Sequence, residues 1–86
     1  MDTENLVIEA SLPPDPDDMN DERAEWAAFA VDQFGEITKM HSAGEPSETI
    51  LGDLLTSLMH YCDRQGIDFK TKLLVAEVNY DAETAE

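Results

Sequence analysis

Apolar residues recur at intervals of three and four in three stretches of the chain, a spacing that places side chains on one face of an α-helix. The middle stretch is the most regular, and its apolar face consists of Leu51, Leu54, Leu55, Leu58, Met59 and Cys62. The first predicted helix starts near Asn20 and ends by about residue 40 or 41. The second starts at residue 46 or 47, and the third runs from Asp68 to about Glu83. The sequence therefore predicts an all-α fold, a small three-helix domain.

Residues at the ends of these stretches support the predicted bounds. Asn20 is a good N-cap for the first helix, Gly66 suits a left-handed C-cap, and Asp68 can cap the third helix. The connection through Gly66 is short, so the second and third helices are antiparallel neighbours or form a tight corner. We expect the core to be filled by the second helix and by two further apolar faces, made of Trp26, Phe29, Ala30, Phe34 and Ile37 and of Phe69, Leu73, Ala76 and Tyr80.

Residues 1–19 differ from the rest, and we assign them to an extended, acidic and proline-rich arm that precedes the helical domain of residues 20–86. Consecutive prolines in Leu12-Pro13-Pro14-Asp15-Pro16 remove backbone donors and exclude a helix there. Two arrangements stay open. Either the arm is flexible, or it lays Leu6, Ile8 and Leu12 along the helices.

The charge balance is the most unusual property of the composition. Twenty Asp and Glu residues stand against five Lys and Arg residues, which gives a net charge of -15. Solubility of a small domain requires a magnitude of only about two to eight. Binding to nucleic acid or to an anionic membrane requires Lys and Arg clusters, so neither is expected as a direct partner. A basic protein surface is the physical complement.

Four carboxylates of the first predicted helix follow one another at spacings of four, seven and four. This acidic stripe, opposite the apolar face, extends over about 20 Å at the rise of an α-helix. Tyr61 is offset from the leucine face of the second helix, which makes it an aromatic contact candidate. The candidate partner-binding residues are Asp21, Glu25, Asp32 and Glu36, with Asp15, Asp17 and Asp18 as supplementary members and Tyr61 as the aromatic one.

No pattern of residues indicates catalysis, a metal or a cofactor. His60 and Cys62 lie two residues apart on a helix, so their side chains point to different sides and cannot share a zinc ion. The chain has no serine elbow and no glycine-rich phosphate loop. We expect a non-enzymatic protein without a metal site or cofactor, in which Cys62 is a core residue.

Three further features of the sequence indicate a cytoplasmic protein. A single cysteine cannot form an internal disulfide, and the first residues, Met1-Asp2-Thr3-Glu4, are acidic where a secretory signal would be basic. No apolar run approaches the roughly 20 residues of a membrane span.

Part of the chain resembles the all-α MazG-type nucleotide pyrophosphohydrolases. The resemblance rests on Leu51-Gly52-Asp53-Leu54-Leu55 and on Asp63-Arg64-Gln65-Gly66-Ile67-Asp68-Phe69, with Trp26 and Phe34-Gly35 upstream. That family carries a Glu-Glu-x-x-Glu motif, which Asp21, Glu22 and Glu25 imitate loosely. It also carries a later Glu-x-x-Asp motif, in which Asp53 is present here but Ile50 stands in the place of the glutamate. The resemblance implies a related helical packing with a degenerate metal motif.

Residues 18–84 are similar to small acidic proteins encoded in prophages and integrative elements of proteobacteria. The matching segments are Glu22-Arg23-Ala24-Glu25-Trp26, the run from Asp53 to Arg64, and Asn79-Tyr80-Asp81-Ala82-Glu83. This resemblance implies a mobile-element context inside a host cell. It transfers no catalytic residues.

Charge and resemblance together lead to a functional expectation. We expect an acidic inhibitor or DNA mimic, of the anti-CRISPR or anti-restriction kind, that binds a basic nucleic-acid-binding protein or effector complex of the host. The alternatives are a helical adaptor or dimerisation module, and a degenerate MazG-like pyrophosphohydrolase. Whether the chain forms a homodimer stays open.

Overall fold

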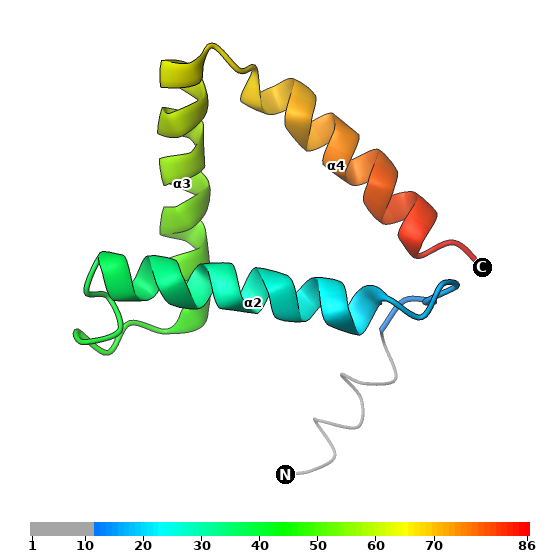
Figure 1. Cartoon of the computed structure of the whole chain (residues 1–86), viewed down its shortest axis with the longest axis horizontal. Helices are drawn as coiled ribbons and strands as arrows, with labels where there is room; N and C mark the ends of the chain where they lie inside the picture. The colour runs from blue at the N-terminus through cyan, green and yellow to red at the C-terminus, as the bar shows by residue number, and fades with distance from the viewer. Residues whose placement is uncertain (1–11) are drawn as a thin grey trace, which may run out of the picture.

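The computed structural model describes residues 12–86, which form three α-helices joined by short connections (Figure 1). Helix α2 covers Asn20–Ile37, α3 covers Ser47–Gln65 and α4 covers Phe69–Glu83, and this part of the chain contains no strand. The prediction of an all-α, three-helix domain is confirmed. Leu6 and Ile8, which we expected to accompany the helices in one arrangement of the arm, lie outside the described residues.

Helix α2 begins where the sequence predicted, but a different residue caps it. Asn20 is the first helical residue rather than the N-cap, which is Met19. Oδ1 of Asp15 accepts hydrogen bonds from the backbone N–H groups of Met19 and Asn20, each at 3.2 Å. The prediction of an Asn20 cap is therefore wrong, because the turn before the helix brings Asp15 back to its first free donors.

Helix α2 ends at Ile37, three or four residues earlier than predicted. Lys39 adopts a left-handed conformation with φ of 63°, which a continuing helix cannot accommodate. The backbone N–H of Thr38 still donates to the Phe34 carbonyl at 3.0 Å, and its hydroxyl donates to the same oxygen at 2.8 Å. Residues 38–44 form a turn that leads to α3.

The signals for the other helix ends are confirmed. Helix α3 starts at Ser47 after an extended Pro46, and Gly66 ends it with φ of 71°. The Ile67 N–H donates back to the Cys62 carbonyl at 2.9 Å across this turn. Asp68 then caps α4 by accepting from the backbone N–H of Lys70 at 3.1 Å.

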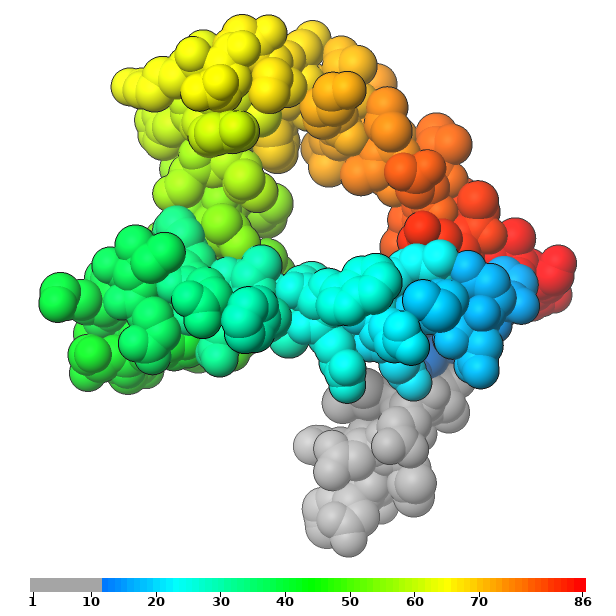
Figure 2. All heavy atoms as spheres, viewed as in Figure 1, coloured from blue at the N-terminus to red at the C-terminus, as the bar shows by residue number. Residues whose placement is uncertain are grey.

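The three helices meet near their ends and frame an open triangle. Figure 1 shows α3 leaving α2 at a steep angle and α4 returning from the Gly66 corner toward the start of α2. The space-filling view shows an opening between them (Figure 2). The last corner is closed by Asn20, whose Nδ2 donates to the Glu83 carbonyl at 2.8 Å, and by Arg23, whose Nε lies 3.3 Å from Glu83 Oε2.

This arrangement buries few side chains. Among the described residues, Ile50 and Cys62 are the buried apolar ones, and the expectation for Cys62 is confirmed. The expectation that Trp26, Phe29 and Ile37 fill a core is wrong, because their exposed fractions are 62%, 67% and 76%. Leu73 and Tyr80 of the predicted inner face of α4 are also exposed. Helices that meet at corners leave most of their length uncovered.

The dimensions agree with this open arrangement. The molecule extends over 40 × 33 × 17 Å, and its radius of gyration is 15.5 Å. A compact domain of this length has a radius of gyration of about 12 Å. The apolar faces that the sequence predicts are present, but the rest of the described residues, 12–86, leaves them largely uncovered.

Candidate functional site

The predicted acidic stripe lies along one side of α2. Asp21, Glu25, Asp32 and Glu36 are all exposed, and at 3.6 residues per turn they fall within an arc of about 60°. Phe29 lies beside them on the acidic side of the helix, where we had placed it on the apolar face. The stripe is therefore a row of carboxylates with an exposed aromatic ring at its edge.

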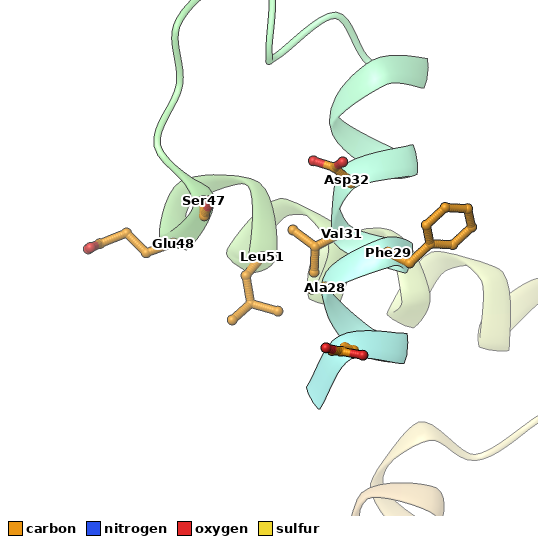
Figure 3. A pocket seen from close by; sticks show the side chains of 8 residues that line it. Ala28, Phe29, Val31, Asp32, Ser47, Glu48 and Leu51 are labelled. Atoms are coloured by element: carbon orange, nitrogen blue, oxygen red, sulfur yellow. The ribbon is translucent and has the colours of Figure 1, made fainter. Parts of the chain in front are cut away.

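Part of the stripe lines a groove between α2 and the first turns of α3 (Figure 3). The groove is open to solvent and has a volume of about 570 Å³. Glu25 and Asp32 contribute carboxylates from α2, and Glu48 contributes a third from α3. Its remaining lining residues are Ala28, Phe29, Val31, Ser47 and Leu51, and Figure 3 shows the Phe29 ring pointing away from Leu51.

This combination of groups matches the chemistry of a long basic side chain. Lys and Arg carry an aliphatic stem that packs on apolar surface and a cationic head that seeks carboxylates. In the groove, Ala28, Val31 and Leu51 supply the apolar surface, while Glu25 and Glu48 supply acceptors on either side. The groove therefore combines the acceptors and the apolar surface that a cationic side chain would contact.

Asp32 also contacts the turn that follows α2. Its Oδ1 lies 3.0 Å from Nε2 of His41, whose ring packs against the buried Gly35. Nε2 of His41 is buried, and no group lies in a geometry that forms a hydrogen bond with it.

Two of the supplementary acidic residues are engaged in local structure. Asp15 caps α2, as described above, and Asp17 forms an ion pair with Arg23, with 2.7 Å between Oδ2 and Nη2. The hydrogen bond from Arg23 lowers the pKa of Asp17, and the same bond raises the pKa of Arg23. Asp18 is exposed in a turn, with a positive φ of 59°. These residues shape the start of α2 and add little free acceptor capacity to the stripe.

The structure does not bring Tyr61 to the stripe. Tyr61 is 56% exposed and lies about one turn before the Gly66 corner, whereas the groove involves the opposite end of α3. The predicted site residues therefore form one acidic surface on α2 and a separate aromatic position on α3.

Sequence reasoning missed Glu48. Its position in the first turn of α3 predicts only a favourable interaction with the helix dipole. Its place opposite Glu25 and Asp32 depends on how α3 crosses α2, which the periodicity of either helix does not specify. An acidic residue after a proline that opens a helix was the only local signal.

Within residues 12–86, no three His, Cys, Asp or Glu side chains are grouped so that they could hold a metal ion. None of the three helices of this region combines the length and the apolar character needed to cross a bilayer.

Comparison with known proteins gave no relative: no family model, no curated protein and no solved structure matches this chain. The resemblances to MazG-type pyrophosphohydrolases and to prophage-borne acidic proteins stay predictions from the residues quoted for them. The functional conclusion below rests on the charge and geometry of this chain.

Proposed function

We propose that this protein is a non-enzymatic acidic inhibitor that binds a basic, nucleic-acid-binding surface of another protein. The observation that carries the proposal is the groove in which Glu25, Asp32 and Glu48 surround a small apolar surface. Few of the chain's own cations compete for these carboxylates. Among the described residues, Arg23 is the one Lys or Arg that forms an ion pair, and its partners are Asp17 and Glu83.

In this proposal the stripe takes the place of a nucleic-acid backbone. Carboxylates four residues apart on a helix have Cβ atoms separated by about 6 Å. Successive phosphates of one strand lie a comparable distance apart, about 7 Å when the path of the backbone is followed rather than its axial rise. A Lys- and Arg-lined channel would meet the stripe through the same heads that bind phosphates. Association would be fast and sensitive to salt.

The proposed target follows from the predicted mobile-element context. A protein carried by a prophage or integrative element benefits from occupying the nucleic-acid channel of a host defence nuclease or effector complex. We therefore propose an anti-CRISPR or anti-restriction role in the host cytoplasm. The carboxylates of the groove require only that the target surface be basic.

The experiment compares two variants with the same change in net charge. The groove variant carries Glu25→Gln, Asp32→Asn and Glu48→Gln, and the control carries Asp53→Asn, Asp63→Asn and Glu86→Gln at exposed positions outside the groove. Each protein, labelled with ¹⁵N, is titrated with an arginine-rich peptide at low salt. We expect shifts at α2 and at the start of α3, lost in the groove variant and retained in the control. Equal weakening by both variants would show a non-specific effect of net charge and would refute the proposed site.

A helical association module is the second candidate, and a specific observation favours it. Trp26, Leu74 and Val78 are more than 60% exposed, with values of 62%, 62% and 67%. A monomer rarely leaves such side chains in solvent over contiguous patches. In this case complex formation would persist at high salt, whereas binding through the acidic groove would not.

A further inference from the structure

Helix α4 presents apolar side chains on two sides. Counted at 3.6 residues per turn, Phe69, Leu73, Ala76 and Tyr80 form one face. Leu74, Val75, Val78 and Ala82 form the other, which we call the outer face of α4. A helix on the surface of a monomer has one apolar face and one polar face. A helix with two apolar faces is suited to packing against two neighbours.

Nothing in the described part of the chain covers the outer face. Leu74 is 62% exposed, Val78 is 67% exposed and Val75 is 48% exposed. The opposite face is no better protected, since Leu73 and Tyr80 are 47% and 57% exposed. The neighbour that would bury these residues lies outside the described part of the chain.

The charges of α4 run against its own helix dipole. Lys70 and Lys72 lie in the first turn, and Asp81 and Glu83 lie in the last turn. Basic groups are unfavourable at a helix N-terminus and acidic groups at a C-terminus. These charges border the outer face as two polar stripes, one of Lys70, Glu77 and Asp81 and the other of Lys72, Asn79 and Glu83.

We infer that the outer face of α4 binds the α4 of a second copy of this chain, in antiparallel orientation about a two-fold axis. In such a pair each polar stripe meets the same stripe of the other copy in reverse order. Lys70 then lies opposite the partner's Asp81, and Lys72 lies opposite the partner's Glu83. The opposed dipoles also place each N-terminus beside a C-terminus, so charges that are unfavourable in one helix become favourable in the pair.

Much of the negative charge lies away from this contact. Asp53 of α3 lies opposite the leucine face of that helix, and the acidic stripe belongs to α2. One repulsive contact is expected. Glu77 lies near the middle of α4, so the two-fold axis brings it close to the partner's Glu77. The inference gives the association module a partner and is independent of the proposed basic target.

Single charge reversals test the inference without disturbing the helix. Lys70→Glu and Asp81→Lys each improve the match between α4 and its own dipole, so helix content measured by circular dichroism should not fall. Sedimentation equilibrium of the full chain should give a dimer mass. Each reversal should weaken that dimer about tenfold, because the altered pair occurs twice across a two-fold axis. Glu77→Gln should strengthen it.

Mixtures of the two variants distinguish an antiparallel pair of helices from a parallel pair. Lys70→Glu mixed with Asp81→Lys should form a heterodimer at wild-type affinity, and the variant with both reversals should recover the homodimer. A monomer mass at every accessible concentration would overturn the inference, and so would a dimer unaffected by either reversal. A parallel pair would place Lys70 beside the partner's Lys72, so Lys70→Glu would strengthen the homodimer and not weaken it. Peptide binding at the groove is measured separately, so failure of the dimer leaves the proposed function standing.

Discussion

Gly35 lies directly under the imidazole of His41. A Cβ built on Gly35 would come within 2.6 Å of His41 Nε2 and 2.7 Å of Cδ2, which is closer than side-chain atoms approach one another. The backbone N–H of His41 also donates to the Gly35 carbonyl at 3.3 Å. The turn after α2 therefore folds back onto the one position in the last turn of the helix that has no side chain.

Replacement of Gly35 should therefore destabilise the protein although alanine favours helices. The propensity gain is about 1 kcal/mol, and displacement of the ring costs about 1–3 kcal/mol. We expect Gly35→Ala to lower the free energy of unfolding in urea, measured at a fixed protein concentration. Gly52→Ala is the matched control, because a Cβ at Gly52 meets no atom within 4 Å, and it should stabilise the protein.

The double variant Gly35→Ala with His41→Ala checks the cause. Removal of the ring should restore the propensity gain, so that Gly35→Ala stabilises the His41→Ala background. Destabilisation of the same size in both backgrounds would show that His41 is not the group that excludes a side chain at position 35.

A glycine in the left-handed turn at the end of α2 should stabilise the protein. Lys39 has φ of 63°, a conformation that costs a residue with a side chain about 1 kcal/mol or more. Lys39→Gly should raise the free energy of unfolding by about 1 kcal/mol, whereas Lys39→Ala, which removes the charge and keeps the Cβ, should not. Thermal denaturation of the two variants in parallel distinguishes the backbone effect from the charge effect.

At the Gly66 corner the opposite holds, because replacement of the glycine should lower the free energy of unfolding. Gly66 has φ of 71°, and a Cβ there would meet open space, so the cost of a side chain is conformational and not steric. We expect Gly66→Ala to lower the free energy of unfolding by about 1–2 kcal/mol. Gly66→Asn should lose less, because asparagine adopts this conformation more readily. Equal losses would contradict this explanation.

The side-chain amide of Asn20 should stabilise the corner where α2 meets α4. Asn20→Ala removes its hydrogen bonds to the Glu83 carbonyl and to Arg23 and should cost about 1 kcal/mol. Amide hydrogen exchange should become faster in the last turns of α4 and stay unchanged in α3. Unchanged exchange in α4 would show that this amide does not hold the corner.

The ion pair of Asp17 and Arg23 should contribute to the pH dependence of the free energy of unfolding. The hydrogen bond from Arg23 lowers the pKa of Asp17 below 3.8, its ordinary value. A lowered pKa in the folded state means that the stabilisation is fully present above pH 3.8 and is lost as the pH falls through the folded-state pKa. Carboxyl ¹³C titration should show the Asp17 pKa returning toward 3.8 in Arg23→Gln. An unchanged value would show that the pair does not form in solution.

The sequence predicted those features that depend on neighbouring residues. Gly66 and Asp68 mark the corner between α3 and α4 because a left-handed cap and a side-chain cap are local requirements. Periodicity also identified the buried Cys62. It could not show that Trp26 is exposed, because a helical pattern defines an apolar face without defining what covers it.

The candidate site was predictable to the same extent. One helix sets the alignment of Asp21, Glu25, Asp32 and Glu36, and its period is enough to find them. Glu48 joins the groove only through the crossing of α2 and α3. The cap made by Asp15 depends on the path of an irregular turn, for which the sequence contained no periodic signal.

The thickness of the molecule has a consequence for how it folds. Its shortest dimension is 17 Å, against 40 Å and 33 Å for the other two. Protein domains form an interior by packing at least two layers of secondary structure against each other. The described helices frame an opening and bury few side chains between them (Figure 2). In the dimer that we infer, a second copy supplies the missing layer, so folding and association should be one cooperative transition whose midpoint rises with protein concentration.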